Sequence, residues 1–163
     1  MKVCLIVCYS HTGVTARVAT ALAKRLGADL EMIKDMRPRQ GISGYLLSVW
    51  EALRQRPAAI LPPRHDPAHY PFIVLGTPIW AGHMSAPMRS YIEQQRDRFQ
   101  RLAVFCTMGG SGGRQVLSAM ADLCHRTPVA TLCLRQQEVL TGRHQRELAD
   151  FADQLALVEH GAS

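Results

Sequence analysis

The sequence lacks long apolar segments, is poor in aromatic residues and has no excess of acidic ones. Of its 163 residues, 6% are aromatic and 20% are charged, and 19 Lys and Arg against 13 Asp and Glu leave a formal net charge of +6. The longest uncharged apolar runs, residues 3–8 and 72–80, are far shorter than the roughly 20 residues of a membrane-spanning helix. With 47% hydrophobic residues, the composition is typical of a globular protein with one core. We therefore expect a single domain over residues 1–163 and no membrane span.

We also expect no leader, and the sequence shows neither a basic tract nor a metal-binding cysteine pattern. The apolar run after Lys2 is short and no small-residue cleavage signature follows it, so we expect a cytoplasmic protein. The positive charges favour anionic partners but are scattered, which argues against nucleic acid. The five cysteines contain no Cys-x-x-Cys pair and have no His at zinc spacing, so we interpret them as structural thiols. The cysteines that lie inside apolar runs are Cys4, Cys8, Cys106 and Cys133.

Short apolar runs alternate with stretches of helical period along most of the chain, a pattern typical of parallel βαβ units. From Val14 to Leu26 apolar residues recur at every fourth position and form one stripe of a helix, which Gly27 can end. The same spacing predicts further helices, including one over about residues 43–55. Strands are expected at residues 3–8, 30–33, 72–75, 102–106 and 129–134. Five strands and five helices in alternation predict a doubly wound, three-layer α/β sandwich.

The loop that follows the first strand has the chemistry of a phosphate site. In a doubly wound sheet, ligands bind beyond the carboxyl ends of the strands, where loops and helix N-termini converge. Residues 10–15, Ser-His-Thr-Gly-Val-Thr, provide hydroxyls, a glycine and backbone amides at the start of a helix. The positive end of the helix dipole lies behind these amides and favours an anion without a metal. The alternative is that Ser10 or Thr12 only caps the helix.

Two further loops are expected at the same edge of the sheet. In the loop over residues 76–85, Trp80 stands between Pro78 and Gly82, and its indole can offer a flat face to a planar ring. The alternative for this indole is a hydrophobic plug over the core. The fourth strand runs into residues 107–113, where four glycines let the backbone approach a ligand closely. A flexible loop without a ligand is the alternative there. The placement of all three loops at one edge favours a shared binding site.

These three loops, in this order and over nearly the whole length of the chain, resemble those of the flavodoxin-like family. The resemblance implies a five-stranded parallel sheet of order 2-1-3-4-5 and non-covalent binding of FMN. It places the phosphate on residues 10–15 and the isoalloxazine between the second and third loops. Two residues depart from the family pattern, because Val14 replaces a common Asn and Met108 stands where many flavodoxins have a second stacking aromatic. The FMN-binding residues that the resemblance implies are Ser10, His11, Thr12, Gly13, Val14, Thr15, Thr77, Pro78, Ile79, Trp80, Ala81, Gly82, Thr107, Met108, Gly109, Gly110, Ser111, Gly112 and Gly113.

The resemblance implies an FMN-binding flavoprotein that accepts and transfers electrons, with a redox partner protein or a small quinone-type acceptor. No Asp or Glu lies in the candidate loops to orient His11 or His83, so no catalytic acid, base or nucleophile is predicted. One alternative is an FMN-dependent NAD(P)H or quinone reductase. A second is a non-enzymatic module that binds an acidic partner through its basic surface. Electron-carrying flavodoxins of short length are usually acidic, whereas this chain carries +6, and its oligomeric state stays open.

Overall fold

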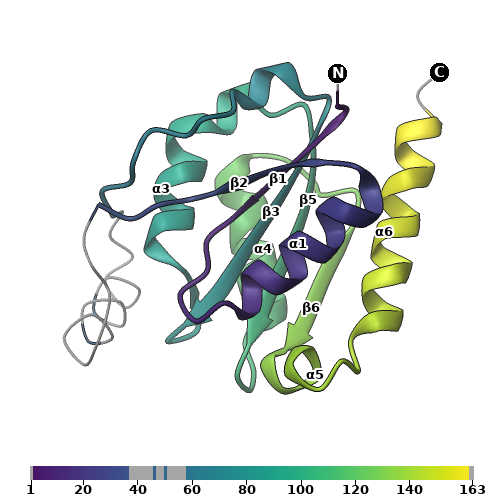
Figure 1. The fold of residues 1–163 in the computed structure, drawn as a ribbon. Coiled ribbons are helices and arrows are strands. Elements are labelled where there is room, and N and C mark those ends of the chain that lie inside the picture. Colours follow the sequence, from purple (N-terminus) through teal and green to yellow (C-terminus); the bar gives the residue numbers. More distant parts are fainter. Residues whose placement is uncertain (1, 37–45, 47–49, 51–57, 162–163) are drawn as a thin grey trace.

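A central parallel sheet with helices on both faces forms the body of the protein (Figure 1). The computed structural model describes residues 2–36, 46, 50 and 58–161. Its sheet has the strand order β2-β1-β3-β5-β6, and β4 (His83–Met84) pairs antiparallel with β3. The parallel strands are β1 (Cys4–Cys8), β2 (Asp29–Met32), β3 (Phe72–Trp80), β5 (Arg101–Met108) and β6 (Thr131–Arg135). The predicted α/β sandwich is confirmed, and its strand order differs from 2-1-3-4-5 only because β4 is an additional strand.

Helices cover both faces of this sheet. On one face lie α1 (Val14–Leu26) and α6 (Gln145–His160), and on the other α3 (Ala86–Gln95) and α4 (Gly113–Cys124). A five-residue helix, α5 (Gln136–Leu140), follows β6 directly and is not predicted by the sequence pattern. Within the part of the chain that the structure describes, no helix has the length and apolar character needed to cross a membrane.

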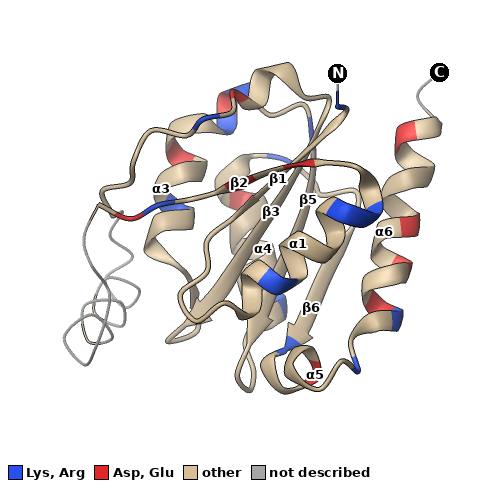
Figure 2. Ribbon diagram, in the orientation of Figure 1, with Lys and Arg blue, Asp and Glu red and all other residues tan. Residues whose placement is uncertain are grey.

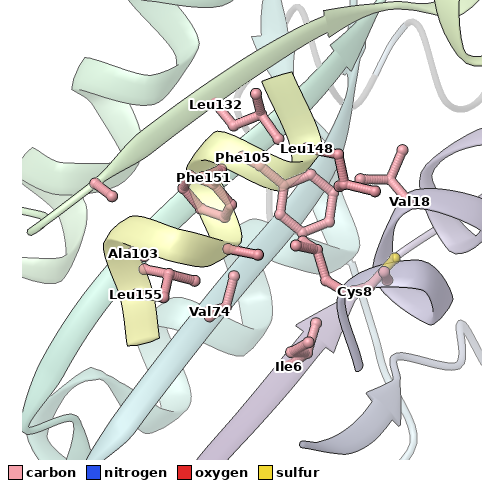
Figure 3. Close-up of a cluster of buried hydrophobic side chains, with 14 of the residues drawn as sticks. Ile6, Cys8, Val18, Val74, Ala103, Phe105, Leu132, Leu148, Phe151 and Leu155 are labelled. Carbon is pink, nitrogen blue, oxygen red and sulfur yellow. The ribbon is translucent and has the colours of Figure 1, made fainter. Parts of the chain in front are cut away.

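Two buried apolar clusters lie on the two faces of the sheet. Side chains alternate along β1, so that Ile6 faces α1 and α6 whereas Leu5 faces α3 and α4. Figure 3 shows the first cluster, to which Phe105 of β5 and Phe151 of α6 both belong. Strands buried on both faces explain why the sequence shows continuous apolar runs rather than alternation.

Glycines set both ends of α1, as the sequence suggests for its end at Gly27. Gly13 precedes the helix with a φ of 95°, and Gly27 ends it with a φ of 62°, both in the left-handed region. The backbone N–H of Gly27 donates to the carbonyl oxygen of Ala23, which closes the last turn. The helix predicted over residues 43–55 lies outside the described residues, except for Leu46 and Trp50, which are exposed.

The third strand is longer than the sequence predicts. The expected strand over residues 72–75 is too short, because β3 continues to Trp80. Gly76 and Pro78 are typical of a break in a strand, which explains the wrong boundary. Gly76 lies inside β3 because a Cβ at this position would overlap the ring of Phe105 on β5.

The segment expected as a loop over residues 76–85 is instead the end of a hairpin. β3 turns back through Ala81 and Gly82 into β4, and Trp80 pairs with His83. Ala81 and Gly82 have φ values of 48° and 79°, and two positive values in a two-residue connection are typical of a type I′ turn. The hairpin thus holds Trp80 at the carboxyl edge of the sheet.

Candidate functional site

The segment after β1 and the carboxyl ends of β3 and β5 meet around a cavity of about 230 Å³ at the carboxyl edge of the sheet. We call it the flavin cavity, because most of its lining residues are ones predicted to bind FMN. Its lining residues come from four places in the sequence, and all except Gln136 are among those predicted. They are His11, Thr12, Val14, Thr15, Pro78, Ile79, Trp80, Ala81, Thr107, Gly109 and Gln136. The structure therefore brings together residues from all three predicted loops, as the carboxyl-edge rule requires.

The first loop leads into the N-terminus of α1 without capping it. The Ser10 hydroxyl accepts a hydrogen bond from the N–H of Gly13, at 3.1 Å, and among the described residues no side chain caps the first turn of α1. That turn contains no acidic residue, and a Cβ on Gly13 would meet nothing within 4 Å. The helix N-terminus thus keeps unsatisfied N–H groups beside open space, which is the arrangement that binds an anion.

A buried hydrogen bond joins the first loop to the third. Thr15 on α1 and Thr107 on β5 both line the cavity, and their hydroxyl oxygens lie 2.8 Å apart. Both residues are more than nine-tenths buried. The pair fixes the distance between the start of α1 and the end of β5, and thereby the width of the cavity floor.

The wall of the cavity on the β3 side is Trp80. Its ring is half-buried and meets Tyr9 edge-on, with ring centroids 5.4 Å apart, and His11 edge-on at 6.0 Å. Ala81 beside it has a left-handed backbone, which is uncommon for a residue with a Cβ and typical of functional turns. These contacts hold an indole in a fixed orientation at the mouth of the cavity.

The third loop reaches the cavity through Thr107 and Gly109. A Cβ on Gly109 or Gly110 would meet nothing within 4 Å, so the chain there is open to an incoming group. Gly112 precedes α4 with a φ of 96°, and among the described residues no side chain caps this helix either. Peptide N–H groups therefore border the cavity from the third loop as well.

The remaining predicted residues lie around the cavity rather than in its lining. The Thr77 hydroxyl is buried and donates to Ser85 Oγ at 2.9 Å, which ties β3 to the start of α3. Met108 directs its sulfur toward Cys133 Sγ, at 3.5 Å, and offers no ring to the cavity. The predicted residues outside the lining are Ser10, Gly13, Thr77, Gly82, Met108, Gly110, Ser111, Gly112 and Gly113.

Gln136 is the lining residue that the sequence analysis missed. It is the first residue of α5, directly after β6. The rule that ligands bind beyond the carboxyl ends of strands applies equally to the last strand, and that signal could have found it. Its side-chain amide adds one donor and one acceptor to the cavity wall.

The donor set and the charge of the site fit FMN. Figure 2 shows that the turns after β1, β3 and β5 carry no Lys, Arg, Asp or Glu, so no carboxylate opposes a phosphate there. The unsatisfied N–H groups lie at the start of α1, and Trp80 and Gly109 both line the cavity. Backbone donors suit the phosphate, and the indole suits the isoalloxazine ring.

Comparisons with known proteins show the family and the fold of this chain. The model of a family described as NADPH-dependent FMN reductase matches residues 1–145. None of the curated proteins searched matches the chain. Among solved structures, a flavoprotein from Lactobacillus acidophilus NCFM, in complex with FMN, is 19% identical with a TM-score of 0.70, over 86% of this chain and 98% of that one. A putative flavoprotein from Bacteroides eggerthii DSM 20697 is 20% identical with a TM-score of 0.68, over 91% and 97%.

A flavodoxin from the domain Archaea shares the fold at a greater distance, with 18% identity and a TM-score of 0.52 over 94% of this chain and 99% of that one. These likenesses show the flavodoxin-like fold. The family match covers most of the chain, including all three loops of the flavin cavity. The protein accordingly belongs to the NADPH-dependent FMN reductase family and is a flavodoxin-like flavoprotein whose cofactor is FMN.

Proposed function

We propose that this protein is an FMN-dependent oxidoreductase that takes electrons from NADPH and passes them to a small quinone-type acceptor. The observation that carries the proposal is the flavin cavity, with the uncapped N-terminus of α1 on one side and Trp80 on the other. The family description supports NADPH as the donor. A flavodoxin-like domain over residues 1–163 is the proposed unit, and the free thiols of all five cysteines support a reducing compartment such as the cytoplasm.

The chain's first task is to hold the phosphate. The N–H groups of the first turn of α1 would donate to the phosphate oxygens, helped by the helix dipole and by the hydroxyl of Thr12. Thr15 contributes less directly, because its hydroxyl already binds Thr107. Backbone N–H groups do not titrate in this range, so the pH dependence of phosphate binding should follow the second ionisation of the phosphate itself, at about pH 6.

The second task is to orient the ring and exclude water from one of its faces. FMN, when bound, supplies the electron-accepting chemistry of this family. Pro78, Ile79 and Trp80 form a continuous apolar wall that fits a planar ring. Gly109 lets the backbone of the third loop approach the ring edge, and its neighbours' N–H groups would donate to acceptors there.

A second candidate function is that of an electron carrier that docks to a redox protein. The observation that favours it is the set of described residues that line the flavin cavity, which contains no Asp, Glu, Lys or Arg. Electron transfer between cofactors needs no acid or base from the protein. The formal charge of +6 points to an acidic partner in that case.

Anaerobic mixing of the FMN-loaded protein with NADPH tests the proposal. We expect the flavin absorbance to bleach at a rate that rises with NADPH concentration, and more slowly with NADH. Addition of benzoquinone should then restore the absorbance. Bleaching only in the presence of a redox protein would favour the carrier, and a chain that retains no FMN after dialysis would contradict both functions.

A further inference from the structure

A second cavity, of about 420 Å³, lies between α4 and the edge strand β6. We call it the thiol cavity, because Cys133 of β6 forms part of its wall. It shares no lining residue with the flavin cavity. We infer that Cys133 is a modification site, whose thiolate forms a mixed disulfide with a small carboxylate-bearing disulfide bound in this cavity. The inference is independent of the proposed function, because it requires neither FMN nor electron transfer.

Cys133 belongs to a cluster of three sulfur atoms. Cys106 of β5 and Cys133 of β6 are partners in the strand register, so they stand next to each other on the same face of the sheet. Cys133 Sγ lies 3.5 Å from Met108 Sδ, and Cys106 Sγ lies 3.8 Å from the carbonyl oxygen of Gly113. The cluster therefore sits below the first residue of α4.

Exposure separates Cys133 from the other cysteines. Cys106 is fully buried, and Cys4, Cys8 and Cys124 are at most 2% exposed, whereas Cys133 is half-buried. On the side of α4, access to its sulfur is closed, because a Cβ on Gly113 would overlap Cys133 Sγ. A reagent must therefore reach this sulfur from the thiol cavity.

The environment of Cys133 favours its thiolate. A hydrogen bond with the Cys106 thiol is the main cause that lowers the pKa of Cys133 to about 7, and the positive charge of Arg135 acts in the same direction. Burial and the carboxylate of Glu138 oppose them. The same interaction, together with burial, strongly raises the pKa of Cys106, so this thiol keeps the proton that it can donate to Cys133 or to the carbonyl oxygen of Gly113. A thiolate is the nucleophilic form of cysteine, so Cys133 is reactive near neutral pH.

The lining of the cavity indicates which disulfide fits. Arg114 of α4 contributes the only charged side chain of the lining and has no hydrogen bond or ion pair through its guanidinium among the described residues. Leu117 and Pro128 provide apolar surface, and Ser118 and Thr131 add hydroxyls. A small disulfide with a carboxylate for Arg114 and an apolar body matches this lining.

The reaction is a thiol–disulfide exchange. Cys133 loses its proton to water, and the thiolate attacks one sulfur of the bound disulfide. One S–S bond forms between Cys133 and that sulfur, the S–S bond of the reagent breaks, and its other half leaves as a thiolate with the electron pair. The small disulfide is the oxidant, and an added thiol reverses the reaction by the same route.

Dithiobis-nitrobenzoate, an aromatic disulfide with two carboxylates, serves as the probe on the FMN-loaded protein at neutral pH. We expect one fast equivalent of released thiolate per chain, and a mass increase of one half-reagent on the peptide that contains Cys133. Cys133→Ser should remove the fast phase, whereas Cys124→Ser, the matched control at a buried thiol, should keep it. A fast phase that survives in Cys133→Ser, or an adduct on another cysteine, would overturn the proposal.

Two further variants test the roles of Arg114 and Cys106. Arg114→Gln should slow dithiobis-nitrobenzoate severalfold and leave the rate with uncharged dithiodipyridine unchanged. Cys106→Ala should move the midpoint of the rate-against-pH curve upward, and Cys106→Ser, which keeps a donor, should restore part of the shift. Equal slowing of both reagents would contradict the assigned carboxylate, and an unmoved midpoint in Cys106→Ala would contradict the assigned hydrogen bond.

Discussion

The flavin cavity and the thiol cavity are built in different ways from the same sheet. The flavin cavity is formed where the ends of β3 and β5 meet the starts of α1 and α5, and contacts between residues far apart in sequence fix it, as the 2.8 Å contact between Thr15 and Thr107 shows. The thiol cavity is formed along the lengths of one helix and one edge strand, α4 and β6, and its lining includes the cation of Arg114 and the half-buried residue Cys133. The residues at the strand ends therefore indicate a cofactor cavity in the sequence itself. The environment of a reactive thiol depends instead on which strands are neighbours in the sheet.

The two cavities also differ in their electrostatics. The described residues that line the flavin cavity include no Asp, Glu, Lys or Arg, so an anion there would be held by helix N-termini and backbone N–H groups. The lining of the thiol cavity includes the positive charge of Arg114 and the thiol of Cys133, whose pKa is lowered to about 7. We therefore expect FMN binding in the flavin cavity to follow the ionisation of the phosphate itself, and reactivity in the thiol cavity to rise as the pH increases through about 7.

The largest expected effect concerns the core below the flavin cavity. In Gly76→Ala the new Cβ overlaps the fully buried ring of Phe105, and overpacking of this kind costs about 3 kcal/mol of unfolding free energy. Urea denaturation measures it. Gly110→Ala, where a Cβ meets nothing within 4 Å, is the control, and Phe105→Leu in the same chain as Gly76→Ala should recover part of the loss. Equal stability of Gly76→Ala and the parent would refute the close packing.

The second largest effect is a loss of stability expected next to Cys133 in the thiol cavity. Gly113→Ala places a Cβ on Cys133 Sγ at the start of α4, and we expect a loss of about 2 kcal/mol in the same denaturation experiment. The loss is smaller than at Gly76 because the sulfur lies at the end of a side chain that can rotate. Adding Cys133→Ala should restore most of the stability. No recovery in the double variant would show that the strain arises elsewhere.

A negative charge at the start of α1 should weaken FMN binding while the protein still folds. Gly13→Asp adds a carboxylate beside the N–H groups proposed for the phosphate, and we expect at least tenfold weaker FMN binding by fluorescence titration, about 1.4 kcal/mol. Gly27→Asp at the other end of the same helix is the matched control, because Gly27 also has a positive φ and open space. Gly27→Asp should keep its FMN affinity. If both variants bind FMN like the parent, residues 10–15 do not hold the phosphate.

The smallest effect is expected at the indole wall. Trp80→Ala should weaken FMN binding by about 1 kcal/mol and alter the flavin absorbance, since an aromatic contact contributes on that order beyond its area. Trp50, which is exposed and does not line the flavin cavity, is the control. Loss of FMN affinity in Trp50→Ala but not in Trp80→Ala would show that the wrong tryptophan was assigned to the flavin.

Much of the flavin cavity could be predicted from the sequence, but little of the thiol cavity. The alternation of apolar runs and helical stripes predicts the parallel sheet, and the three loops contain all lining residues of the flavin cavity except Gln136. The hairpin through β4 was missed because Gly76 and Pro78 resemble strand breakers when their neighbours are unknown. The residue pattern within one segment does not show that β3 needs a glycine at Gly76, where the ring of Phe105 leaves no room for a Cβ.

The thiol cavity depends on contacts between strands, which the residue pattern within one segment does not show. Cys106 and Cys133 both lie in apolar runs, and the sequence analysis treats them alike as structural thiols. Their different surroundings follow from the register of β5 against β6 and from β6 being an edge strand, which are long-range properties. The sequence therefore predicts the packing of Cys106 and gives no sign of the accessible sulfur of Cys133.

A crystal structure of the FMN-loaded protein tests most directly whether the cavity at the carboxyl ends of β1, β3 and β5 is the flavin site. We expect the phosphate at the N-terminus of α1, within hydrogen-bond distance of the N–H groups of residues 12–16, and the isoalloxazine ring between Trp80 and Gly109. An isoalloxazine in the thiol cavity against Arg114, or a phosphate away from α1, would contradict this assignment.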